Sequence, residues 1–331
     1  MPSLPGEVIL QVVESLIPKT SRKIYRPKDI ETQTLIGLTL ACKLTHQLAR
    51  RILFRHCLYI DSRERLDSLL DKSGYFANND ASTPDHQCIQ AFSLLLAPFP
   101  QYSLEEPHIV HQIDRLFGHV FPTLQNLVID MPLRSLYPDE DAQGVRKVLR
   151  AAFCRLAALE DFCSVQDELF LDSIDRGAEP EVWTTWPRLR RLALYNPDVE
   201  GRFVDALHRC PNLTHLVIAR PDSYMCQPLS INESSCLPLT LQRLLVLNTR
   251  DGRLSDVRVA KSSEWEASFW NCMMHSKSLT RCSLCYVDVP VPTGREDDGI
   301  DLCQVWLRAH AVDGALWEFP GTTYPADYMN A

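Results

Sequence analysis

The chain has 331 residues, of which 45% are hydrophobic and 23% are charged, and this balance excludes a disordered chain. No apolar run is long enough to predict a membrane-spanning helix, and with only 12 glycines the Gly-rich turns that bind phosphates or dinucleotides are disfavoured. The net charge is 34 minus 42, or −8; residues 1–62 hold nine Lys and Arg against five Asp and Glu, so they carry +4 and the remainder −12. Because phosphate neutralisation needs a basic field over the binding surface, this distribution argues against nucleic-acid binding.

A first helix is predicted from residue 5 to residue 16. Pro5 suits the first helical position, and Glu7 lies in the first turn, at the positive end of the helix dipole. Apolar residues then recur at helical spacing until Pro18 ends the run. The apolar stripe consists of Val8, Ile9, Val12, Val13 and Leu16.

Residues 18–29 are predicted to form an exposed loop, because they contain two prolines and five Lys or Arg. Beyond residue 29, apolar residues return at helical spacing, which predicts two more helices or one kinked helix. These residues are Leu35, Leu38, Leu44, Leu48 and Ile52. Three helices of this kind could share one small core.

Four N-terminal segments carry a further pattern: Leu4-Pro5-x-Glu7-Val8, Leu38-x-Leu40-x-Cys42-Lys43, Leu48-Ala49 and Leu53-Phe54-Arg55-His56. Together they resemble an F-box, and the run that continues into Leu58-Tyr59-Ile60 is most like the F-box proteins of filamentous fungi. The link between the first two helices is longer than is usual in that family. An ordinary three-helix subdomain is the alternative interpretation.

The resemblance implies that residues 1–56 form a three-helix module that docks on the Skp adaptor of a cullin-RING ubiquitin ligase. Other subunits of such a ligase transfer the ubiquitin, so the resemblance implies no catalytic residue in this chain. The residues that it assigns to adaptor binding are Leu4, Pro5, Val8, Val12, Leu16, Leu38 and Cys42.

Residues 57–331 are predicted to form a repeat array. An apolar pattern typical of a short strand recurs from the anchors Leu124, Leu159, Leu189, Leu213, Leu241 and Leu279, and a helical stripe precedes most of them. A helix and strand unit cannot bury both elements alone, so neighbouring units must stack, with a parallel sheet on the inner curve. Further strands are predicted at 58–60, near 92–96 and at 316–319.

The predicted fold class is therefore α/β, with the helical module followed by an irregular leucine-rich-repeat-like solenoid. A doubly wound sheet is the alternative, but the sequence lacks the phosphate loop that such a fold would place at its switch point.

No catalytic or metal signature stands out in the sequence. Cys282 and Cys285 have a spacing that can hold zinc, but they lie on a predicted strand and so point to opposite faces, one to the core and one to the surface. His108 and His111 are interpreted as surface histidines. We expect no metal, no cofactor and no enzymatic activity.

One row of polar residues is more suggestive of binding. The third position of successive strands is Asn126, Asp161, Arg191, His215, Arg243 and Arg281, and these positions are predicted to face the open, concave side of the sheet. Such a row beside an apolar strip could hold an acidic or phosphorylated peptide, although ordinary solvated arginines are the alternative. The predicted target-binding residues are Arg191, Tyr195, His215, Arg243 and Arg281.

These observations lead to one functional hypothesis and two alternatives. The chain is predicted to be the substrate-recognition subunit of an SCF-type (Skp, cullin and F-box) ubiquitin ligase, with the Skp adaptor, the cullin scaffold and an unidentified target protein as partners. A leucine-rich-repeat interaction scaffold without ligase function is the first alternative, and a sensor that binds a hydrophobic small molecule on the concave strip is the second. The resemblance, and 12 cysteines without a disulfide framework, indicate a cytoplasmic or nuclear protein. The charge distribution and the lack of a long apolar run predict no nucleic-acid or membrane partner.

Overall fold

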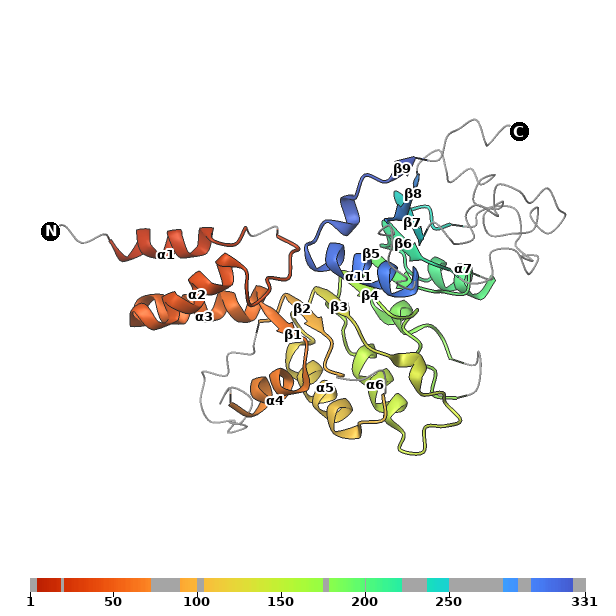
Figure 1. Ribbon diagram of the computed structural model, residues 1–331, viewed down its shortest axis with the longest axis horizontal. Coiled ribbons are helices and arrows are strands. Elements are labelled where there is room, and N and C mark those ends of the chain that lie inside the picture. The colour runs from red at the N-terminus through yellow and green to blue at the C-terminus, as the bar shows by residue number, and fades with distance from the viewer. Residues whose placement is uncertain are drawn as a thin grey trace.

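The computed structural model describes residues 5–18, 21–72, 90–99, 104–174, 179–199, 201–221, 237–249, 282–290 and 299–323. Over these residues the protein is α/β, with eight α-helices and one nine-stranded sheet (Figure 1). The predicted binding residues Leu4 and Arg281 and the anchor Leu279 lie outside the described residues. No helix in the described part of the chain is long and apolar enough to cross a membrane.

The helices are α1 Gly6–Ser15, α2 Ile30–Ala41, α3 Lys43–His56, α4 Arg63–Lys72, α5 Pro107–Val120, α6 Val145–Cys154, α7 Gly201–His208 and α11 Gly299–Val312, with the 3-10 turns η1 Leu133–Ser135, η2 Val182–Thr185 and η4 Leu316–Glu318. The strands are β1 Leu58–Ile60, β2 Ser93–Leu96, β3 Asn126–Ile129, β4 Asp161–Ser164, β5 Arg191–Tyr195, β6 His215–Ala219, β7 Arg243–Thr249, β8 Ser283–Val289 and β9 Thr322–Thr323.

The strands lie in the sheet in the order in which they occur in the chain, and β1 to β8 are parallel. The predicted strands at 58–60 and near 92–96 are confirmed as β1 and β2. The prediction of a strand at 316–319 is wrong, because Leu316–Glu318 form the turn η4. The last strand, β9, follows it and pairs antiparallel with β8.

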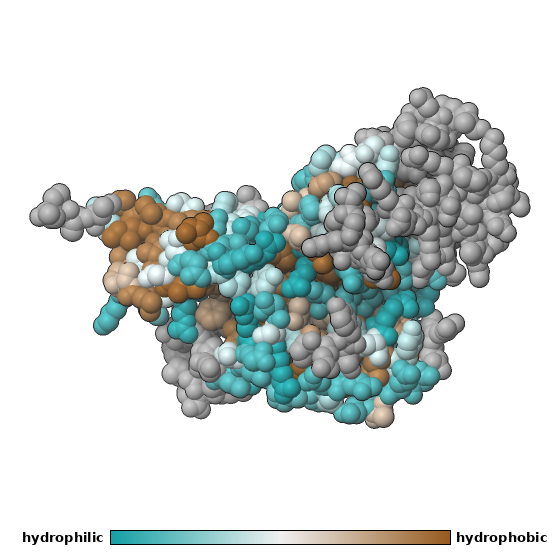
Figure 2. All heavy atoms as spheres, in the orientation of Figure 1, coloured by the Kyte–Doolittle hydropathy of each residue, from teal (hydrophilic) through white to brown (hydrophobic). Residues whose placement is uncertain are grey.

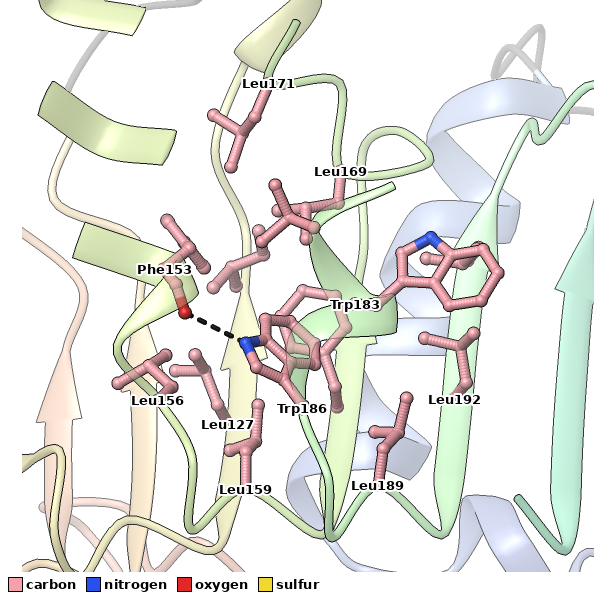
Figure 3. Close-up of a cluster of buried hydrophobic side chains, with 14 of the residues drawn as sticks. Leu127, Phe153, Leu156, Leu159, Leu169, Leu171, Trp183, Trp186, Leu189 and Leu192 are labelled. Atoms are coloured by element: carbon pink, nitrogen blue, oxygen red, sulfur yellow. Dashed lines mark hydrogen bonds between the residues drawn. The ribbon is translucent and has the colours of Figure 1, made fainter. Parts of the chain in front are cut away.

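The helices α4 to α7 cover one face of the sheet, which we call the outer face (Figure 1). Alternate residues of each strand point into this layer because side chains along a strand alternate between its two faces. The strand residues of this layer include Leu94, Leu127, Phe162, Leu192, Leu216, Leu244 and Leu284. Trp183 and Trp186 come from the segment that connects β4 to β5 and are buried in this layer, and the Trp186 indole Nε1 donates a hydrogen bond of 2.9 Å to the Phe153 carbonyl (Figure 3).

The opposite, inner face is also covered, and this corrects the prediction of an open concave side. The strand residues that point to it are Leu95, Val128, Cys163, Ala193, Val217, Leu245 and Cys285. They pack against α11, η4 and Ile24, forming a second buried core. The sheet is therefore the middle layer between α4–α7 and the C-terminal helix.

The helical module α1–α3 has a core of its own, separate from both layers beside the sheet. It is built from Val13, Ile17, Tyr25, Leu35, Leu48, Ala49 and Ile52. The predicted apolar stripe of the first helix therefore divides: Val13 is buried in this core, whereas Val8 and Val12 are exposed.

The linker between α1 and α2 joins the module to the sheet, although its charges had predicted an exposed loop. Ile24 is buried in the inner-face core, and the next residue, Tyr25, is buried in the module core. The Ile24 amide donates to the Val312 carbonyl at 2.8 Å, and the Tyr25 amide donates to the His56 carbonyl at 3.1 Å. Gly314 has φ +71° and lies so close that an added Cβ would stand 3.0 Å from the linker backbone. The linker thus packs into the inner-face core on one side and into the module core on the other.

Replacing Trp186 with Phe tests the outer-face packing. The change removes the indole donor to the Phe153 carbonyl and leaves a small void, so we expect the free energy of unfolding to fall by about 2 kcal/mol. Urea denaturation measures this. Trp306→Phe, on the half-buried face of α11, is the control and should cost less; an equal or smaller loss for Trp186→Phe would contradict this account of the packing.

Replacing His56 with Gln tests the joint between module and sheet. His56 is buried at the end of α3, and burial, aided by the nearby Arg55 charge, lowers its pKa to about 4. The unfolded chain takes up this proton near pH 6.5 and the folded chain only near pH 4, so His56 lowers the free energy of unfolding as the pH falls between these values, by at most ~3 kcal/mol. In His56→Gln this contribution should vanish, whereas the exposed control His111→Gln should follow the parent; parallel pH curves for His56→Gln and parent would contradict the assignment.

Candidate functional site

The helical module exposes a set of large apolar side chains that we call the apolar patch: Val8 and Val12 of α1, Ile36 and Leu40 of α2, and Leu44 of α3. Leu40 is 83% exposed and Val12 is 58% exposed, although each lies beside a well-packed core. Figure 2 shows hydrophobic residues gathered over the end of the molecule that α1 and α2 form. A contiguous exposed apolar area of this kind is typical of a surface that binds a partner.

Within each helix the patch follows from helical geometry. Val8 and Val12, and likewise Ile36 and Leu40, are four residues apart and so lie on one face of their helix. The start of α1 is close to the start of α3, since a Cβ added at Gly6 would lie 3.3 Å from Leu44 Cδ2. The module core thus holds three helices in an arrangement that leaves these residues exposed.

The structure places most of the predicted adaptor-binding residues on the surface of the module. Pro5, Val8, Val12 and Cys42 are exposed. Leu16 and Leu38 are half-buried and pack against the module core.

Sequence reasoning missed Ile36, Leu40 and Leu44 as members of the surface. The signal was present, because the apolar residues of α2 are spread around the helix and one face cannot bury them all.

The polar row Asn126, Asp161, Arg191, His215 and Arg243 lies across five neighbouring strands, as predicted, with each residue paired to the next. The sixth position is corrected: the residue paired with Arg243 is Ser283. Strand β8 is shifted by two residues relative to the prediction, because Leu284 takes the place opposite Leu244 that the prediction gave to Cys282.

The first half of the polar row holds the linker. The Asn126 side-chain amide donates to the Arg22 carbonyl at 2.8 Å. Asp161 accepts hydrogen bonds from Arg191 Nη1 at 2.9 and 3.0 Å and from Arg22 Nη1. Burial raises the pKa of the Asp161 carboxyl above its ordinary value, and the two guanidiniums oppose this shift. One carboxylate that is 2% exposed therefore binds two cations from distant parts of the chain.

The second half of the row contacts a segment that we call the C-terminal strap, residues 318–323. Arg243 Nη2 donates to the Phe319 carbonyl and, at 3.4 Å, to the Pro320 carbonyl. His215 Nε2 lies 4.0 Å from the Glu318 carboxylate. Tyr195 is buried in the inner-face core. A role for these residues in binding a target stays a prediction, and it requires that the strap leave the row.

The two cysteines with a zinc-like spacing were predicted to point to opposite faces of a strand, one to the core and one to the surface. Cys282 and Cys285 do lie on opposite sides of the sheet, Cys282 in the outer-face core and Cys285 in the inner-face core. Neither is a surface thiol, because both sides of the sheet are covered. His108 and His111 are exposed, as predicted. Among the described residues, no three His, Cys, Asp or Glu side chains are grouped so that they could hold a metal ion.

Replacing Asp161 with Asn tests the ion-pair cluster in the polar row. Two guanidiniums would lose their shared charge partner in a buried place, so we expect the free energy of unfolding to fall by about 3–5 kcal/mol. Asp114→Asn is the matched control, because Asp114 pairs with Arg155 at the exposed surface and should cost less than about 1 kcal/mol. Urea denaturation compares the two; equal effects would mean that the buried cluster does not stabilise the fold.

Comparison with models of known protein families finds no match for this chain, and comparison with curated proteins finds no significant relative either. What the chain does is therefore inferred from its own residues. Two features stand out: an apolar patch on a helical module, and a polar row on which the chain has folded its own linker and strap.

Proposed function

We propose that this chain is the substrate-recognition subunit of an SCF-type ubiquitin ligase. In this proposal the module α1–α3 docks on the Skp adaptor, which connects the chain to the cullin scaffold, and the sheet with its helices presents a surface to a target protein. The chain contributes no catalytic residue, and it acts in the cytoplasm or the nucleus. The F-box resemblance and the three-helix arrangement of the module support this reading.

The observation that carries the proposal is the apolar patch. Val12 and Leu40 are more than half exposed although the module has its own buried core, so the patch is not needed to hold the three helices together. Burial of apolar area contributes a favourable free energy of roughly 25 cal/mol per Å². A partner groove that covered these side chains would therefore gain this free energy on binding. A partner helix or groove that covers α1 and α2 fits this surface.

The structure bears on the two alternative functions, the interaction scaffold and the small-molecule sensor, in different ways. A leucine-rich-repeat scaffold without ligase function would use the same apolar patch for another partner, and only a binding experiment separates it from the ligase subunit. The sensor for a hydrophobic small molecule loses its support, because the strip on which the ligand would bind is packed against α11 and η4.

The proposal is tested by co-expressing the chain with an Skp adaptor and separating the products by gel filtration. The parent chain should co-elute with the adaptor in a 1:1 complex. Val12→Glu places a charge where the partner should bury an apolar side chain, which costs several kcal/mol, so the affinity should fall by at least about a hundredfold. Because Val12 is 58% exposed, the variant should keep the unfolding transition of the parent.

Val305→Glu is the matched control, since Val305 is 67% exposed on α11, away from the module. It should co-elute with the adaptor as the parent does. If Val12→Glu folds and still binds, the interface lies elsewhere. If the parent chain itself does not bind the adaptor, the scaffold alternative replaces the ligase subunit.

A further inference from the structure

The polar row carries more positive than negative charge where the strap crosses it. Arg191 and Arg243 lie there on either side of His215, and Arg22 binds the same carboxylate as Arg191. Burial and the nearby Arg191 charge lower the pKa of His215, so the guanidiniums carry the positive charge of the row. Against these stand the Asp161 carboxylate, which is already shared by two guanidiniums, and the Glu318 carboxylate of the strap. The row therefore has an excess of cationic charge in a place where most of the side chains are largely buried.

The donors of this row are not all satisfied. Within the described residues, the buried Nε groups of Arg191 and Arg243 have no hydrogen-bond acceptor. A buried guanidinium donor without an acceptor is costly, so native structures normally provide one. The two donors lie on strands β5 and β7, with His215 between them on β6, and they mark the part of the row that suits an anionic group.

The strap packs closely over this site but brings little negative charge to it. Its carbonyl oxygens accept hydrogen bonds from Arg243, and the Glu318 carboxylate, 78% exposed, approaches His215 at 4.0 Å. The Phe319 ring packs edge-on against Trp306 at 5.0 Å, and β9 adds a pairing of only two residues to β8. The strap thus brings one distant carboxylate and neutral carbonyl groups to the row. These groups neutralise the positive charge of the guanidiniums only in part.

We propose that the Arg191, His215 and Arg243 row is a binding site for an acidic peptide segment, and that the strap is its tethered, intramolecular competitor. An incoming segment with several carboxylates would displace residues 318–320 and satisfy the guanidinium donors in their place. The proposal deepens the proposed function, on which it rests for identifying that segment as part of a target protein. The binding itself requires no adaptor.

The test uses the full chain and fluorescently labelled hexaglutamate as the probe, with hexaglutamine as the uncharged control peptide. Fluorescence anisotropy should detect weak, salt-sensitive binding of hexaglutamate to the parent and none of hexaglutamine. Glu318→Gln removes the competing carboxylate and should bind hexaglutamate roughly two- to fivefold more tightly, as expected for loss of one exposed charge contact. Arg243→Gln should bind it at least about tenfold more weakly than the parent.

Glu64→Gln, at an exposed glutamate on α4, is the matched control and should bind as the parent does. The Glu318→Gln variant alters only an exposed side chain, so it tests the proposal even if Arg243→Gln does not fold. Failure to bind hexaglutamate, or equal affinity in the parent and Glu318→Gln, would overturn the proposal. Adaptor co-elution is measured on the same samples: if it fails while the peptide still binds, the ligase assignment is wrong and the acidic-peptide site stands.

Discussion

The carboxylate of Asp161 is the point on which the arrangement of the whole chain depends. It binds Arg191 on the neighbouring strand β5, and it also binds Arg22 of the linker, 139 residues earlier in the sequence. The desolvation of a buried carboxylate is offset only if its partners stay in place. Because Arg22 is one of those partners, the linker is held on the sheet, and with it the helical module α1–α3 to which the linker belongs.

Beyond Arg22, the linker contacts both the C-terminal helix and the helical module. Ile24 enters the core between the sheet and α11, and its amide binds the last carbonyl of that helix. Tyr25 enters the core of the module, while Arg26 pairs with Asp313 at 3.2 Å just after α11. The module, the sheet and the C-terminal helix therefore meet at one short segment. The apolar patch takes no part in these contacts and stays exposed.

Much of this architecture could be predicted from local pattern. Alternating apolar residues fixed the register of five strands, because a shift of one residue would turn every Leu of the pattern to the wrong face. The same reasoning placed Arg191, His215 and Arg243 side by side. It failed at β8, where Cys282 and Leu284 both suit a core position and only packing against Leu244 decides between them.

The closure of the inner face could not be predicted in this way. Small and apolar residues such as Ala193 and Val217 suit an open binding strip and a covered core equally well. The charges of the linker predicted solvent exposure because the partner of Arg22 is too distant in the sequence to be recognised. On the module, the apolar residues of α2 are spread around the helix, so one face cannot bury them all, but identifying Leu40 as exposed required the positions of α1 and α3.

The claim that the linker is held between the module and the sheet is tested most directly by amide hydrogen exchange at Ile24 and Tyr25. Their amides donate to the Val312 and His56 carbonyls inside two cores, so both should exchange as slowly as the strand amides of β5 and β6. In Arg22→Met, which removes one cation from Asp161, the exchange of both amides should become faster while the central strands stay protected. Rapid exchange at Ile24 and Tyr25 in the parent chain would contradict the account, because it would show that the linker is not held between the module and the sheet.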